Sequence, residues 1–199
     1  MFKKIKVLLA ALVMLCAGSA FADDFDWSQC WCNYGGGIKE GNILVNIDGG
    51  INYVDLTYAG YNGFWFIPTV MVDVQYAKPI WKLPFAFGGY AGVRASGYKV
   101  YTYENGSYVY KDVSKFTIFA GAEASYHVML PPKNLDVYAV NRIGFGIPVV
   151  SGSYAAPYVV TDFLDFNISF GANYFFSDNF GLNLELGAPV SKFGITLKF

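Results

Sequence analysis

The C-terminal stretch, residues 164–199, limits the fold of this chain more than any other feature of its sequence. Every second residue is apolar in three segments, 164–176, 180–186 and 193–199. Because successive side chains of a β-strand point to opposite faces, a period of two predicts strands. The intervening positions carry Asn, Ser, Gly, Thr and charged residues, so each predicted strand has one apolar and one polar face. In a transmembrane barrel the apolar face meets lipid and the polar face lines the lumen.

The first 22 residues have the three parts of a secretory signal peptide. Three lysines among the first six residues precede an apolar run, 7–17, which is followed by an A-x-A motif ending at Ala22. We expect cleavage near Ala22. Cys16 raises the alternative of a lipoprotein, but Leu15 precedes it where a small residue is expected, which disfavours lipidation.

The composition fits an exported membrane barrel. The chain has 14 lysines and arginines, three of them in the signal, against 15 acidic residues, so the exported part carries a net charge of −4. No basic stretch remains to bind nucleic acid. Outside the signal, no run reaches the about 18 apolar residues of a membrane-spanning helix. Yet 54% of the chain is hydrophobic, 19% is aromatic and only 15% is charged, as expected for a barrel with an apolar outer wall.

We therefore predict an all-β protein with a signal peptide at 1–22, a periplasmic N-terminal extension at 23–40 and an eight-stranded antiparallel up-and-down transmembrane β-barrel at 41–199. The predicted strands are 42–52, 64–77, 83–96, 115–128, 135–147, 164–176, 180–187 and 193–199. Long connections, 53–63, 97–113 and 148–162, alternate with short ones, 78–82, 129–134 and 177–179, as in barrels with short periplasmic turns and longer external loops. The last external turn, 187–191, is short and departs from this pattern.

The longest connection carries its own hairpin signal. Asn105-Gly106 predicts a type I′ turn, and tyrosines flank it on both sides. We expect the two neighbouring strands to continue beyond the membrane as a ribbon that presents its tyrosines for surface contacts. These are Tyr101, Tyr103, Tyr108 and Tyr110.

Two cysteines of the extension, Cys30 and Cys32, lie one residue apart in a compartment expected to be oxidising. No further Cys or His lies nearby, which disfavours a metal site. The C-x-C spacing differs from the C-x-x-C of redox motifs. A local or intermolecular disulfide remains the preferred interpretation.

The polar faces predict a charged lumen. Its lining residues are Asp48, Asp73, Arg94, Glu123, Arg142, Asp165, Glu185 and Lys192. A buried charge is costly unless it is paired, so we expect a paired polar network that fills the lumen. The strand positions place Arg142 and Lys192 in the outer half of the lumen, and Asp73 and Glu123 in the inner half. A narrow or gated water path, in space left by lumen glycines, is the alternative.

Two other protein classes fit the sequence less well. A soluble lipocalin-like barrel would place the lumen charges on its exterior and crowd aromatic rows into a narrow lumen. An enzyme needs a base near its substrate, and the only histidine, His127, is predicted at the periplasmic end, where a structural role is preferred. We expect no enzymatic activity, no cofactor and no metal.

The turn at 174–181 and the C-terminal alternation resemble small bacterial outer-membrane proteins of the OmpA-domain, OmpX and OmpW type. The resemblance covers about 41–199. It implies an integral location in the bacterial outer membrane, contact with its lipids and lipopolysaccharide, and delivery by periplasmic chaperones to the β-barrel assembly machinery. In that group the machinery recognises a terminal Phe after alternating apolar residues. The matching residues here are Phe193, Ile195, Leu197 and Phe199.

Two functions remain open at this stage. The first is a structural or surface-interaction role, in which the external loops bind a host molecule, another surface protein or lipopolysaccharide. The second is a narrow channel or transporter for small solutes. The barrel motifs alone do not separate the two.

Overall fold

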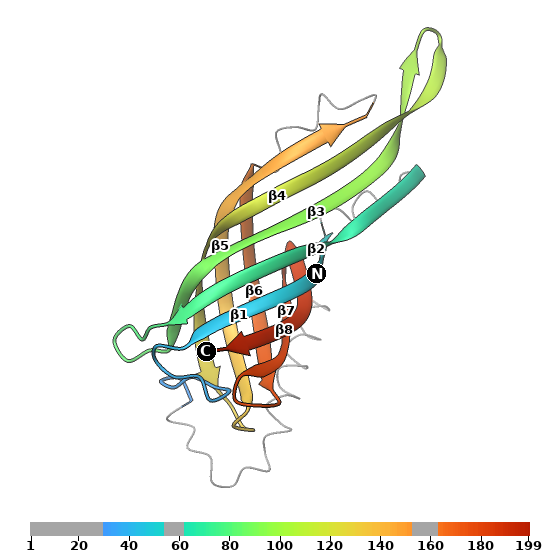
Figure 1. The fold of residues 1–199 in the computed structure, drawn as a ribbon. Helices are drawn as coiled ribbons and strands as arrows, with labels where there is room; N and C mark the ends of the chain where they lie inside the picture. Colours follow the sequence, from blue (N-terminus) through green and yellow to red (C-terminus); the bar gives the residue numbers. More distant parts are fainter. Residues whose placement is uncertain (1–29, 54–61, 153–162) are drawn as a thin grey trace, which may run out of the picture.

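Eight antiparallel strands form a closed barrel, which confirms the predicted fold class. The computed structural model describes residues 30–53, 62–152 and 163–199, and the predicted signal peptide lies outside these ranges. Each strand pairs with the next, and the last pairs with the first (Figure 1). The strands are β1 (Ile43–Asn52), β2 (Asn62–Ala77), β3 (Phe85–Glu104), β4 (Ser107–Met129), β5 (Leu135–Ser151), β6 (Leu164–Phe175), β7 (Phe180–Ala188) and β8 (Val190–Lys198). No helix among the described residues is long and apolar enough to cross a membrane.

The alternation of apolar and polar residues in the sequence corresponds to the outer and inner faces of the barrel. Where β8 closes the barrel on β1, Ile47 is aligned with Ile195, and its neighbour Asn46 is aligned with Thr196. The side chain of Ile47 is 42% exposed, whereas Asn46 and Thr196 are buried. The same alternation runs along β6 from Leu164 to Phe170, where the polar positions are buried and the apolar positions are exposed. The core of the barrel is therefore polar and its wall is apolar.

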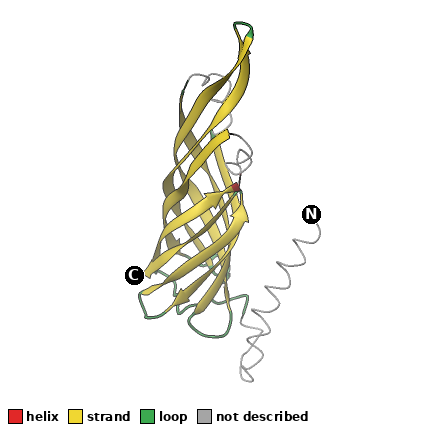
Figure 2. Cartoon of the chain, turned by 90° about the vertical axis from the view of Figure 1, so that its right-hand side faces the viewer, coloured by secondary structure: helices red, strands yellow, loops and turns green. Residues whose placement is uncertain are grey.

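β3 and β4 extend well beyond the other strands as a two-stranded ribbon (Figures 1 and 2). The pairing continues without a break up to Glu104 and Ser107. Between them, Asn105 and Gly106 have φ angles of 50° and 81°, the left-handed conformations that a type I′ turn requires. The turn predicted from Asn105-Gly106 is therefore present.

β2 contains an irregularity that the alternation did not predict. Its register with β3 shifts between Ile67 and Val70, around Pro68, which has no N–H to give to the ladder. The extra residue aligns Phe66 with the buried Ser96, but the Phe66 side chain is 38% exposed, as expected for the outward row in which the sequence pattern placed it.

Residues 30–40, here called the plug segment, lie across the end of the barrel that also holds the C-terminus (Figure 1). The Gly36 N–H donates to the Leu135 carbonyl at 2.9 Å, and the Met129 N–H donates to the Cys30 carbonyl at 3.1 Å. Ile38 is buried in a cluster with Leu44, Ala77 and Phe175. The sequence had predicted only an extension without a regular period.

Candidate functional site

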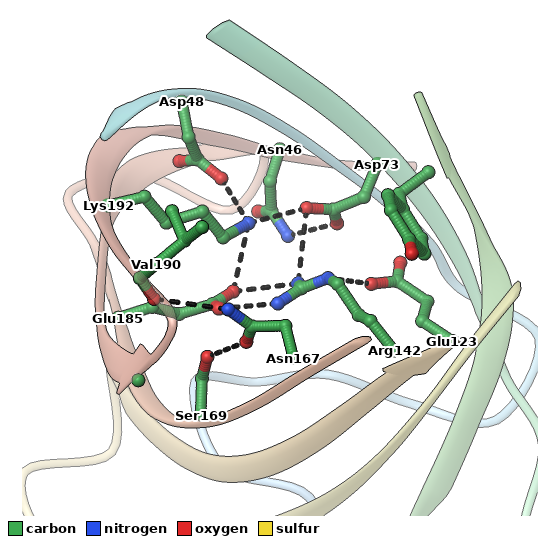
Figure 3. A network of polar contacts seen from close by, with 12 residues as sticks. Asn46, Asp48, Asp73, Glu123, Arg142, Asn167, Ser169, Glu185, Val190 and Lys192 are labelled. Atoms are coloured by element: carbon green, nitrogen blue, oxygen red, sulfur yellow. Dashed lines mark hydrogen bonds and ion pairs between the residues drawn. The ribbon is translucent and has the colours of Figure 1, made fainter. Parts of the chain in front are cut away.

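Six buried charged residues meet in one ionic cluster inside the barrel (Figure 3). Arg142 of β5 lies at its centre. Its Nε donates to Glu123 Oε2 at 2.7 Å, and its two terminal nitrogens donate to Glu185 at 2.6 and 2.8 Å. Nη2 also lies 3.5 Å from Asp73 Oδ2. One guanidinium thus binds carboxylates from three other strands, using the planar donor geometry that makes arginine suited to such contacts.

Lys192 of β8 is the second cation of the ionic cluster. Its Nζ lies 2.5 Å from Asp48, 2.8 Å from Asp73 and 2.9 Å from Glu185. These three carboxylates converge closely enough to hold a metal ion, but the ammonium group already binds all three. Asn46 Nδ2 donates to Asp73 Oδ1 at 2.7 Å and so connects β1 to β2.

Strand pairing explains two of the six ion pairs, and other contacts depend on closure of the barrel. Glu123 and Arg142 are direct partners on β4 and β5, and Glu185 and Lys192 are direct partners on β7 and β8. Direct partners bring their side chains within contact distance. The bonds from Arg142 to Glu185 and from Lys192 to Asp73 instead cross the lumen.

The ionic cluster corrects the depths expected from sequence. Arg142 and Lys192 were placed in the outer half of the lumen, with Asp73 and Glu123 in the inner half, but all four belong to the ionic cluster. Strand tilt and stagger bring residues from different points along their strands to the same level.

The lumen glycines make room for large side chains. A Cβ on Gly194 would lie 2.4 Å from Asp48 Oδ1, and one on Gly171 would lie 2.4 Å from the Tyr138 ring. The space that these glycines leave is therefore already filled, which weakens the argument that they open a water path.

Arg94 and Asp165 form a separate pair toward the ribbon. Arg94 Nη1 donates to Asp165 Oδ1 at 3.2 Å, and the Tyr90 hydroxyl donates to Asp165 Oδ2 at 2.7 Å. The Arg94 guanidinium lies 5.2 Å from the centre of the Phe119 ring. The cavity left between this pair and Arg142 measures about 20 Å³, enough for about one water molecule.

His127, Ser125 and Asp136 form a buried chain on the plug-segment side. His127 Nδ1 lies 2.9 Å from Asp136 Oδ2, and His127 Nε2 lies 2.9 Å from Ser125 Oγ. This arrangement has the order of a catalytic triad. However, Ser125 is only 1% exposed and its hydroxyl donates to Gln75 Oε1 at 2.5 Å. Gln75 in turn donates to Asp73 at 3.3 Å, which joins the chain to the ionic cluster.

Sequence reasoning did not identify Asp136 as a lumen residue. Asp136 accepts one hydrogen bond from Asn173 Nδ2 at 3.0 Å and also contacts His127. Extending the alternation of β5 by one step, from Tyr138 to position 136, would have placed it on the polar face.

The plug segment seals this end of the lumen with polar contacts. Lys198 Nζ donates to the Gly36 carbonyl at 2.8 Å, and the Tyr34 hydroxyl donates to the Phe85 carbonyl. Burial, followed by the nearby charges of Glu40 and Asp136, raises the pKa of Tyr34 to about 12. Tyr34 therefore stays a neutral phenol up to a pH at which an ordinary tyrosine has already ionised.

The two cysteines of the plug segment lie in different environments. Cys30 is buried and Cys32 is exposed, and no disulfide joins them in this described part of the chain. The predicted disulfide stays a prediction.

The remaining predicted residues lie on the outside. Tyr101, Tyr103, Tyr108 and Tyr110 are all exposed on the ribbon. Phe193 and Phe199 are 55% and 64% exposed, while Ile195 and Leu197 face the same side and are partly covered. Both Phe199 backbone groups bond to Ile43, so the last residue completes the closing ladder.

Comparison with known proteins finds similarity to solved structures alone. No protein-family model matches the chain, and no curated protein matches it. A solved structure described as "De novo design of transmembrane beta-barrels" is similar in fold, with a TM-score of 0.41 and 18% sequence identity, over 81% of this chain and 98% of that chain. The resemblance to the OmpA-domain, OmpX and OmpW group stays an expectation.

Proposed function

We propose that this chain is an integral outer-membrane barrel with a closed lumen, whose role is structural and whose external ribbon binds partners at the cell surface. The observation that carries this proposal is the inverted burial of the barrel. Arg142, Glu185 and Asp73 are at most 2% exposed, whereas Ile118, Phe145 and Ile147 on the wall are 52%, 60% and 68% exposed. In water this arrangement would expose a continuous apolar surface, and lipid removes that cost.

The closed lumen supports a structural role over transport. The ionic cluster crosses the barrel, because Arg142 of β5 contacts Asp73 of β2 and Glu185 of β7, and Lys192 of β8 also contacts Asp73. The plug segment and the Ile38 cluster close one end. A solute path would require several buried ion pairs to separate, each at a cost of several kcal/mol. A channel role is therefore the weaker proposal.

The buried chain at His127 gives no support to an enzyme. Ser125 is only 1% exposed to a substrate, and its hydroxyl already donates a hydrogen bond to Gln75 Oε1. We propose that Ser125, His127 and Asp136 act as a structural link between the ionic cluster and the plug-segment end. Export, chaperone contact and recognition of Phe199 by the assembly machinery belong to the same proposal.

The test is reconstitution of the refolded chain into lipid bilayers. We expect insertion, seen as a heat-dependent shift in gel mobility and resistance to alkaline extraction, together with an electrically silent planar bilayer. A folded, monodisperse protein in buffer without detergent would contradict the membrane location. Stable, reproducible conductance steps would contradict the closed lumen and favour the channel.

A further inference from the structure

Four tyrosines gather on one side of the ribbon and form what we call the tyrosine face: Tyr101 and Tyr103 of β3, and Tyr108 and Tyr110 of β4. Their exposed fractions are 59%, 61%, 63% and 56%. The ring centres of Tyr101 and Tyr108 lie 4.9 Å apart with an interplanar angle of 12°, and Tyr110 lies 4.8 Å from Tyr101. The rings thus contact one another and remain open to the surroundings. Exposed apolar surface of this kind marks an interaction site.

The tyrosine face continues the outer wall of the barrel. Side chains on the same side of β3 and β4 follow one another in steps of two residues. The wall pair Ala95 and Phe116 is followed by Gly97 and Ser114, then by Lys99 and Asp112, then by the pair Tyr101 and Tyr110. Six residues of strand correspond to about 20 Å. The tyrosine face therefore lies on the same side of the strands as the lipid-facing wall. It is farther along the strands than the apolar wall residues and than the charged pair Lys99 and Asp112.

The charges near the tyrosine face are balanced. Lys99 lies 3.9 Å from Asp112, and Lys111 lies 2.7 Å from Glu104. A partner that binds here is therefore not selected by net charge. Four phenol rings offer flat apolar surfaces with a hydroxyl at each tip, whereas the wall below uses Phe, Ile and Val. This chemistry suits a polyhydroxylated ligand whose C–H faces pack on rings and whose hydroxyls form hydrogen bonds.

We propose that the tyrosine face binds the sugar chain of a glycolipid that is anchored in the same membrane leaflet as the barrel. This inference rests on the proposed membrane location, because only then do the rings point into the layer directly above the lipid headgroups. This binding holds neighbouring glycolipids against the barrel. Glycolipid sugar chains are then the class of ligand for the proposed surface-interaction role.

The experiment uses the full chain reconstituted in phospholipid nanodiscs and the deacylated oligosaccharide of lipopolysaccharide as the probe. We expect saturable binding, followed by calorimetry, and loss of affinity by about tenfold or more in a Tyr101→Ser, Tyr108→Ser variant, because two stacking rings are removed. The matched control is Thr102→Ser, Val109→Thr, which changes the opposite side of the same ribbon and should bind as the original chain does.

A second arm tests whether the ligand comes from the same leaflet. In nanodiscs that already contain lipopolysaccharide with its full sugar chain, we expect the added oligosaccharide no longer to bind, whereas nanodiscs containing only lipid A should leave binding intact. Equal binding in all nanodiscs would overturn the same-leaflet source. Absence of binding by a chain that inserts normally would overturn the sugar ligand and leave the membrane barrel standing. Failure to insert would instead contradict the proposed function.

Discussion

Arg142 of β5 and Glu185 of β7 are joined across the lumen by two hydrogen bonds, at 2.6 and 2.8 Å, although β6 lies between their strands. Removing the guanidinium leaves Glu185 and Glu123 buried with fewer cationic partners. We expect Arg142→Ala to lower the free energy of unfolding by about 3–5 kcal/mol. Urea unfolding from lipid vesicles, followed by the heat-dependent gel shift, measures this loss.

A double-mutant cycle isolates the Arg142–Glu185 bond from the loss of packing. The variants are Arg142→Met, Glu185→Gln and their combination, and residues in direct contact should show a coupling energy. We expect the combined variant to be more stable than the sum of the single losses predicts, because neither charge then remains without its partner. Additive losses would show that the two side chains act independently.

The alternation of apolar and polar residues was sufficient to place the eight strands and their two faces, because this alternation is a local property of each strand. It put Glu123, Arg142 and Lys192 on the polar side, and the structure has all three buried in the lumen. It could not give the contact between Lys192 and Asp73, which depends on how the closed barrel tilts and staggers its strands.

Segments without a period were the ones that sequence reasoning missed. The plug segment docks through single contacts, such as the Gly36 N–H to the Leu135 carbonyl, and through the burial of Ile38. The register shift near Pro68 was missed for a related reason, since the alternation was read through it as though the strand were regular.

A charge on the outer wall separates a membrane barrel from a soluble one. Ile118 is 52% exposed and aligned with Ile147 on the neighbouring strand. We expect Ile118→Arg to cost about 2–4 kcal/mol of stability in a bilayer, because the arginine must enter hydrocarbon. Urea titration in vesicles gives the value.

The control for this prediction is Tyr103→Arg, which is 61% exposed but lies on the ribbon beyond the wall. Its effect on stability should be within about 0.5 kcal/mol, as for ordinary surface positions. Equal, small effects of the two substitutions would indicate that the wall around Ile118 does not meet lipid.

Close packing at Gly35 holds the plug segment in place. A Cβ there would lie 2.5 Å from the Leu135 carbonyl oxygen and 2.6 Å from Asp136 Cα, both backbone atoms. We expect Gly35→Val to displace the plug segment and expose Cys30, which is 3% exposed in the native fold. In a Cys16→Ser, Cys32→Ser background, maleimide labelling of Cys30 followed by mass spectrometry should become at least about tenfold faster, as for a site that opens locally.

Gly49→Val serves as the matched control, because a Cβ at Gly49 meets no atom within 4 Å. It adds the same side chain in β1 without pressing on the backbone of a neighbour, so Cys30 should stay protected. Fast labelling of Cys30 in both variants would show that the plug segment is not docked tightly even in the native barrel.

The raised pKa of Tyr34 makes docking of the plug segment sensitive to high pH. Burial, then Glu40 and Asp136, raise this pKa from 10.0 to about 12, because the docked segment favours the neutral phenol. The contribution of Tyr34 to docking is therefore fully present below pH about 10 and is lost as the pH rises toward about 12.

The phenolate absorbance of the original chain minus that of Tyr34→Phe should show one tyrosine titrating near the upper value. In the Gly35→Val background, the absorbance difference between the chains with and without Tyr34 should show a tyrosine that titrates near its ordinary pKa, because the plug segment is displaced. Titration of Tyr34 near pH 10 in the original chain would mean that its ring is not buried against the barrel.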